Sequence, residues 1–85
     1  MVKVKEFGGV RNQFLIHTDE GVYFQSYDSI IAFRPYNGKI VIGGDWEYSR
    51  TTGKYRNMFL GETKAETQKK LDDGKYTYDP DLTIT

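Results

Sequence analysis

The chain has 85 residues, and its twelve Lys and Arg balance its twelve Asp and Glu, so the formal net charge is zero. A balanced charge excludes the strong overall attraction of a basic protein to nucleic acid or acidic membranes. Cysteine is absent, which excludes disulfides and thiolate metal sites, and no apolar run approaches the roughly 18 residues of a membrane span. The N-terminal MVKVKEF lacks the apolar core of a signal peptide, so we expect a protein of a reducing cytosol.

The first third of the chain has the pattern of strands separated by turns. Residues 2–6 alternate valine with lysine until Gly8-Gly9 interrupts the pattern. Residues 12–18 form the next predicted strand, around an apolar centre. Asp19-Glu20-Gly21 then predicts a hairpin turn in which Gly21 takes the left-handed conformation, and residues 22–27 return as its second strand.

Asn37-Gly38 is the strongest turn signal in the sequence. It lies between an apolar strand at residues 30–33 and a second apolar strand at residues 39–42. Because Asn and Gly tolerate positive φ angles, the pair predicts a tight type I′ hairpin turn. Residues 46–48 continue the pattern and are expected to prolong the sheet.

Ser49 predicts the start of a helix, because its side-chain oxygen can accept from the amides of Thr51 and Thr52. We interpret these three residues as the structural cap of a helix that begins at Arg50 and ends at Gly61.

On a helical wheel Thr51, Tyr55, Met58 and Phe59 share one face, with Thr52 at its edge. We therefore expect Tyr55, Met58 and Phe59 to be buried against the sheet. The cations of this helix then remain on its open side.

Thr63 and Glu66 form a capping box for a second helix over roughly residues 64–73, in which only Ala65 and Leu71 are available for burial. Tyr76 and Tyr78 alternate with polar residues and predict a last short strand. Residues 80–85 are expected to be a tail.

Early strands followed by late helices indicate the α+β class. We expect a single domain over residues 1–85, built from a small antiparallel sheet of about four to six strands. One or two short helices from the C-terminal half should cover the sheet.

The residues do not favour catalysis or a metal site. His17 is the one histidine, and no nucleophile lies near it in sequence. No motif typical of a zinc or calcium site occurs, and Asp19-Glu20 and Asp72-Asp73 fall at a predicted turn and a predicted helix end. We therefore expect no enzyme and no cofactor.

Residues 45–60 (DWEYSRTTGKYRNMFL) combine hydroxyls, cations and aromatic rings, which suits either the capped start of a packed helix or a surface that grips an anion. Cations and polar groups on a rigid helix also make good anchors for a partner. The candidate partner-binding residues are Arg34, Tyr36, Arg50, Lys54, Arg56 and Asn57.

Basic and aromatic residues alternate between positions 34 and 56, which is also the pattern of a strip for single-stranded nucleic acid. Asp45 and Glu47 interrupt that strip, and their charges would repel phosphate. A small nucleic-acid-binding module is therefore the alternative to a protein-binding surface.

Three segments of this chain resemble a family of small bacteriophage and prophage proteins: residues 26–32 (SYDSIIA), 46–54 (WEYSRTTGK) and 59–61 (FLG). Members carry a Ser-Tyr-Asp segment before an apolar strand, then a Tyr-Ser-x-Thr-Thr-x-Lys-Tyr run, then Phe-Leu. The resemblance covers roughly residues 22–71 and is to an uncharacterised family, so it carries over no catalytic residues.

What the resemblance implies is an origin. It suggests a non-enzymatic phage accessory protein in the cytoplasm of a bacterial host, a monomer or homodimer without a membrane anchor. Such a protein would bind and inhibit a host macromolecule, with a defence nuclease or a CRISPR effector as candidate targets, in the manner of an anti-CRISPR inhibitor.

Overall fold

The computed structural model describes residues 2–84 and contains one six-stranded sheet, in the order β1-β2-β3-β4-β5-β6, with two α-helices. The strands are Lys3–Glu6, Gln13–His17, Gly21–Ser26, Ser29–Pro35, Val41–Gly43 and Thr77–Asp79. The helices are η1 (Phe7–Gly9), α1 (Arg50–Leu60) and α2 (Lys64–Asp72). The predicted α+β class with helices in the C-terminal half is confirmed. Met1 and Thr85, the ends of the predicted domain, lie outside the described residues.

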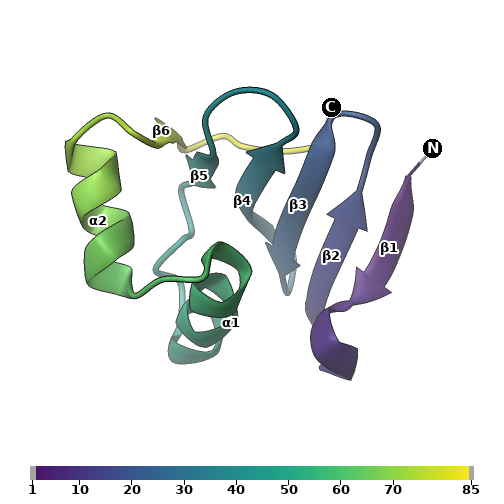
Figure 1. Ribbon diagram of the computed structural model, residues 1–85. Coiled ribbons are helices and arrows are strands. Elements are labelled where there is room, and N and C mark those ends of the chain that lie inside the picture. The colour runs from purple at the N-terminus through teal and green to yellow at the C-terminus, as the bar shows by residue number, and fades with distance from the viewer. Residues whose placement is uncertain (1, 85) are drawn as a thin grey trace.

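The sheet is mixed, whereas the sequence predicted an antiparallel one. β1 to β5 pair antiparallel with their neighbours, but β6 runs parallel to β5. A parallel pair needs a long crossover, and here both α-helices lie within the connection from β5 to β6. In Figure 1 α1 packs across one face of the sheet, while α2 stands outside the β5–β6 edge.

The core lies between the sheet and α1. One row of cross-strand partners on the helix side joins Leu15, Phe24, Ala32 and Ile42 across four strands. The Phe24 and Phe59 rings stack with centroids 5.7 Å apart, which fixes α1 over β3. The buried apolar cluster consists of Phe24, Ile31, Ala32, Ile42, Trp46 and Phe59.

Local capping signals were read correctly. The Ser49 side chain accepts from the Thr52 amide at 3.1 Å, and α1 begins at Arg50. Gly61 ends the helix in the left-handed conformation, with a φ of 70°. The capping box of α2 is also present, because Thr63 and Glu66 bond to each other's backbone amides.

The buried face of α1 is rotated by about one residue from the predicted one: Phe59 is buried and Tyr55 is half-buried against the core as expected, but Met58 is not buried. Thr52, Arg56 and Phe59 are buried, whereas Met58 is 55% exposed and Thr51 is exposed. The reason is that polar residues of this face find partners inside the protein. The hydroxyl of Thr52 and that of Ser26 in β3 are hydrogen-bonded at 2.8 Å, which turns Thr52 toward the sheet.

The glycine of the β2–β3 hairpin serves a different purpose from the one predicted. Gly21 is not left-handed but nearly extended, with a φ of 158°, and it pairs with Pro35 as the first residue of β3. A Cβ there would lie 2.7 Å from the Pro35 Cα and 2.8 Å from the Phe33 ring. The close approach of β4 therefore requires glycine.

The Asn37-Gly38 hairpin exists, but its turn is not type I′. Gly38 has the predicted positive φ, 108°, whereas Asn37 is not among the positive-φ residues. A two-residue turn would pair Phe33 with Ile42, and the structure pairs Phe33 with Val41. One cause is that the Tyr36 amide bonds the Glu20 carbonyl at 2.9 Å, which holds the chain in a wider loop.

Two further expectations on the C-terminal half were wrong, one of them in part. Residues 46–48 form a turn and not a strand, because β5 already ends at Gly43 and the Tyr48 amide bonds the Asp45 carbonyl at 2.9 Å. On α2 the expectation holds for Leu71, which is half-buried against the core, but Ala65 is exposed and the one buried residue is Thr67. Thr67 turns inward because its hydroxyl donates to the Glu62 carboxylate at 2.6 Å.

The short strand predicted around Tyr76 and Tyr78 is present as β6. After β6 the chain runs back toward β3, where the C-terminal end lies in Figure 1. Leu82 is half-buried, its amide bonds the Asp79 carbonyl at 3.1 Å, and its Cβ lies 3.5 Å from the point where a Cβ on Gly43 would stand. The first part of the expected tail, up to Leu82, thus lies close to β5.

Adjacent residues of α1 test the rotation of its buried face. We expect Phe59→Ala to lower the free energy of unfolding by roughly 3–5 kcal/mol, because it empties the core against Phe24. Met58→Ala should change it by within about 0.5 kcal/mol, because Met58 is largely exposed. Urea denaturation measures both. Equal losses for the two variants would contradict the rotated face.

Candidate functional site

A surface groove of about 640 Å³ follows the N-terminal half of α1. It brings together four of the six residues predicted to bind a partner, namely Arg50, Lys54, Arg56 and Asn57. We call it the basic groove, and its lining consists of Glu47, Ser49, Arg50, Gly53, Lys54, Arg56, Asn57 and Lys64.

The basic groove is strongly positive although the whole chain is neutral. Arg50, Lys54, Arg56 and Lys64 face a single carboxylate, that of Glu47. The amino-terminal end of α1 adds the partial positive charge of its unpaired amides. The groove thus has the field and the donors for an anionic group.

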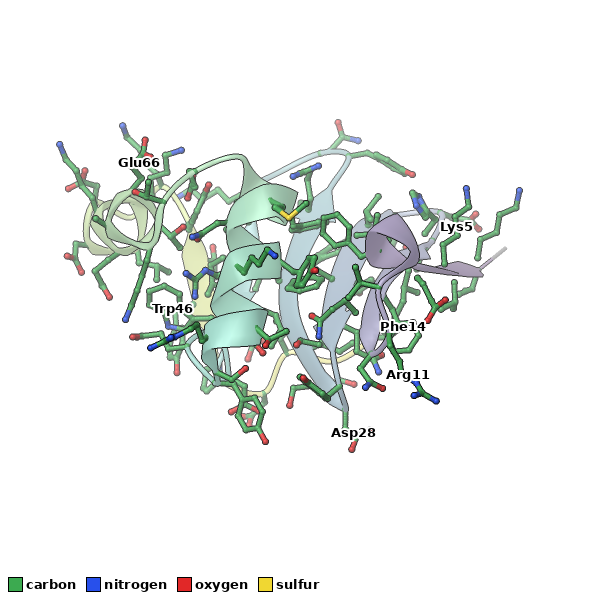
Figure 2. All side chains as sticks on the ribbon, turned by 90° about the horizontal axis from the view of Figure 1, so that it is seen from below. Lys5, Arg11, Phe14, Asp28, Trp46 and Glu66 are labelled. Carbon is green, nitrogen blue, oxygen red and sulfur yellow. The ribbon has the colours of Figure 1, made fainter. Side chains whose placement is uncertain are left out.

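Arg56 forms the floor of the groove and is only 2% exposed. Its Nη1 donates to the Trp46 carbonyl at 2.5 Å, and its Nη2 donates to the side-chain oxygen of Asn57 at 3.0 Å. The guanidinium carbon lies 5.0 Å from the centre of the Trp46 ring. Figure 2 shows Trp46 on the side of α1 that faces α2.

The burial of Arg56 corrects its interpretation as an exposed cation. Desolvation lowers the pKa of Arg56 below its usual value, and the charges of Glu47 and Glu62 oppose this shift. Nevertheless, among the residues that the structure describes, Arg56 forms no ion pair, and its buried Nε has no hydrogen-bond acceptor. Its positive charge therefore remains uncompensated by a close anion.

The other predicted residues of the helix lie around this floor. Arg50 and Lys54 are exposed, so their charges are available to a ligand in the groove. Ser49 and Thr52 act as the predicted cap, and Ser49 Oγ lies 3.1 Å from the hydroxyl of Thr52. The Thr51 side chain is exposed, and no described hydrogen bond of the cap involves it.

Lys64 and Glu47 were missed as groove residues. Their side chains form an ion pair at 2.6 Å that joins the start of α2 to the turn before α1. Both side chains are about half exposed, so the pair adds little stability. No local sequence signal marks this contact, because it depends on how the two helices are placed.

Arg34 and Tyr36 do not belong to the groove. Arg34 donates to the Phe59 carbonyl, and its guanidinium lies 4.5 Å from the Phe59 ring centre. It therefore completes the carboxyl-terminal turn of α1, at the other end of the helix. Tyr36 is 64% exposed on the β4–β5 loop, beside a hollow lined by Asp19 and Glu20.

Sequence reasoning also missed a pair of exposed tyrosines next to the groove. The rings of Tyr27 and Tyr48 meet edge to face, with centroids 6.4 Å apart, and the residues are 40% and 65% exposed. Tyr27 has a φ of 55°, a conformation that costs a bulky residue about 1 kcal/mol or more. We call these two residues the tyrosine pair.

A second polar cluster joins Glu62, in the linker between the two α-helices, to α2 and to Tyr76 just before β6. The Glu62 carboxylate accepts from Lys70 at 2.6 Å, from Thr67 at 2.6 Å and from the Tyr76 hydroxyl at 2.8 Å. Burial by itself raises the pKa of Glu62, but hydrogen bonds from Lys70, Thr67 and Tyr76 outweigh it, so the net pKa is lowered.

The same cluster shifts both of the other titratable partners. The hydrogen bond to Glu62 raises the pKa of Lys70. Burial, and then the hydrogen bond to Glu62, raises the pKa of Tyr76. Each shift favours the proton arrangement that the hydrogen bonds use, with Glu62 ionised and its two partners protonated.

Within residues 2–84 no group of three His, Cys, Asp or Glu side chains is placed to hold a metal ion. Over the same residues no helix has the length and apolar character needed to cross a membrane.

Comparison with known families identifies the chain at the level of a family. The profile of a family of unknown function (DUF8033) matches residues 2–75. The chain belongs to this family. No curated protein and no solved structure matches it.

The Glu62 cluster predicts how stability depends on pH. Because the folded pKa of Glu62 is lowered, its contribution is complete above the unfolded value of about 4.3. It is lost as the pH falls through the folded pKa. We expect Glu62→Gln to be less stable than the parent at pH 7, with the difference shrinking as the pH falls below about 4. Thermal unfolding across pH measures this.

Glu6→Gln, an exposed change on β1, is the control and should follow the parent at every pH. A constant difference between Glu62→Gln and the parent from pH 7 to pH 3 would contradict the assignment.

Proposed function

We propose that this protein is a non-enzymatic accessory protein of a bacteriophage. In this proposal it acts in the cytoplasm of the bacterial host, where it binds and inhibits a host protein of acidic surface, with a defence nuclease or a CRISPR effector as the target class. The basic groove is the binding surface. The phage setting is supported by the resemblance of the Ser-Tyr-Asp and Tyr-Ser-x-Thr-Thr segments.

One observation carries the proposal. The groove gathers four cations around a single carboxylate, and the most buried of them, Arg56, has no ion-pair partner among the described residues. A desolvated charge without a counter-ion costs free energy, and an anionic group of a partner would offset that cost. Arginine on a rigid helix is also a frequent hot spot of interfaces.

The composition of the groove supports a binding role over catalysis. It contains no histidine or cysteine. Its serine, Ser49, accepts the Thr52 amide and contacts the Thr52 hydroxyl, so its oxygen is committed to capping α1. The lysines lie on the rim, where they are suited to attract an anion.

Single-stranded nucleic acid is the second candidate, because the exposed tyrosine pair lies beside the basic groove. Bases could stack on the rings while phosphates contact the cations. Against it, the two turns that carry these tyrosines also carry three exposed acidic residues: Asp28, Asp45 and Glu47. These carboxylates would repel the continuous charge of a phosphate backbone, whereas a protein can place its acidic side chains in the groove and uncharged ones beside the tyrosines.

Charge reversal of the two exposed cations tests the proposal. We expect Arg50→Glu/Lys54→Glu to keep the fold, because exposed substitutions usually change stability by within about 0.5 kcal/mol each. It should abolish capture of the host protein that the parent chain retrieves from bacterial lysate, identified by mass spectrometry. The reason is that the field of the groove is reversed.

Lys3→Glu/Lys5→Glu is the matched control, with the same charge change on the exposed strand β1, and should capture as the parent does. If the groove variant still captures the same protein, the partner binds elsewhere. If the parent chain binds an immobilised oligonucleotide with an affinity that falls steeply with salt, and Arg50→Glu/Lys54→Glu does not bind it, the result would instead favour the nucleic-acid alternative.

A further inference from the structure

The tyrosine pair combines two features that the fold itself does not need. Both rings are substantially exposed, so they contribute little to the core. Tyr27 also occupies the left-handed region, where a bulky side chain is disfavoured and Gly or Asn would be preferred. A two-residue hairpin turn itself requires this conformation, so the feature without a structural reason is the bulky, exposed ring at that position.

The fold holds the pair rigidly in place. Tyr27 and Asp28 form the two-residue turn between β3 and β4, since Ser26 pairs with Ser29. The Tyr27 amide donates to the Asn12 carbonyl at 2.7 Å, and the Tyr27 carbonyl accepts from Gln25 Nε2 at 2.6 Å.

On the other side, Tyr48 belongs to the turn before α1, and Ser29 Oγ donates to Asp45 of that turn at 2.8 Å. The two turns are thus tied to each other. Figure 2 shows Asp28 projecting from the tip of the hairpin, so this end of the molecule is open.

The pair is also linked to the basic groove through the chain and through one hydrogen bond. Tyr48 lies between Glu47 and Ser49, and both of these residues line the groove. The Ser26–Thr52 hydrogen bond joins the hairpin that carries Tyr27 to the first turn of α1. The tyrosines do not line the groove itself, but a ligand that extends from the groove past Glu47 and Ser49 would reach Tyr48.

We propose that the tyrosine pair is an anchor site for an apolar or aromatic side chain of the same acidic protein whose carboxylates enter the basic groove. The inference rests on the proposed function. Tyrosine and arginine together are typical of interface hot spots, because a rigid amphipathic ring buries much area at low entropic cost. Asp28 and Asp45 disfavour any anion at this position, phosphate or carboxylate, so the occupant is an uncharged side chain of the protein whose carboxylates lie in the groove.

NMR titration of the ¹⁵N-labelled chain tests this with two synthetic peptides, Ac-Glu-Glu-Phe-Glu-Glu-NH₂ and the same peptide with Gly in place of Phe. We expect both to shift the amides of Arg50 and Lys54. The Phe peptide should also shift Tyr27 and Tyr48 and bind about three- to tenfold more tightly.

Each of the single variants Tyr27→Asn and Tyr48→Ser should remove the gain in affinity of the Phe peptide over the Gly peptide. Neither should change the dissociation constant of the Gly peptide. Tyr27→Asn should melt at or above the temperature of the parent, because Asn tolerates the left-handed conformation. Tyr36→Ser is the control, since Tyr36 is as exposed as Tyr48 but lies on the β4–β5 loop outside the groove, and it should keep the gain.

Three outcomes would overturn the inference, and they differ in what else they overturn. If the two peptides bind equally, or if Tyr27→Asn and Tyr48→Ser retain the gain, the anchor site is wrong and the groove stands. If neither peptide shifts Arg50 or Lys54, the proposed function fails as well. If an eight-residue oligothymidine binds more tightly than either peptide, the occupant is nucleic acid.

Discussion

The contact between Arg56 and Trp46 is the constraint on which the rest of this structure depends. The chain leaves β5 after only three residues and must reverse before α1 can cover the sheet. The guanidinium of Arg56 bonds the Trp46 carbonyl and lies over the Trp46 ring, so it attaches that turn to the helix. The same contact buries Trp46 in the core and places the positive charge beneath the groove.

Burying the Arg56 guanidinium to attach this turn is unfavourable in free energy. Its desolvation costs several kcal/mol, and a hydrogen bond from a charged donor returns only about 1.5–3 kcal/mol. Glu47 and Glu62 reduce the cost at longer range, because their charges favour the ionised form of Arg56. The part of the desolvation cost of Arg56 that these interactions do not offset is the physical reason to expect an anion in the groove. It also makes a neutral chain locally attractive to an acidic partner, and screening by salt confines that attraction to short range.

The ends of the helices could be predicted from the sequence because residues close together in the chain determine them. The Ser49 cap, the Gly61 stop and the Thr63–Glu66 box all depend on contacts within four positions along the chain, and all three are present. The α+β class followed from the same kind of information. Of the six residues predicted to bind a partner, the four on α1 lie together in the basic groove, whereas Arg34 and Tyr36 lie outside it.

Contacts between segments that are distant in the chain could not be predicted from the sequence. The face of α1 depends on Ser26 and Trp46, which offer partners to Thr52 and Arg56, so a hydrophobic wheel placed Met58 inside and Arg56 outside. Likewise Lys64 lines the groove only because of where α2 lies relative to α1. Tyr27 and Tyr48 come together only because two separate turns meet, and composition alone cannot show that.

Hydrogen exchange of the arginine side chains, observed by NMR at the Nε–H group, tests the central claim most directly. The account predicts that Arg56 Nε–H exchanges at least about tenfold more slowly than that of the exposed Arg50, because its nitrogen is buried beneath the helix. Equal exchange rates for Arg56 and Arg50 would show that the guanidinium lies in solvent, and would contradict both the anchored turn and the charged floor of the groove.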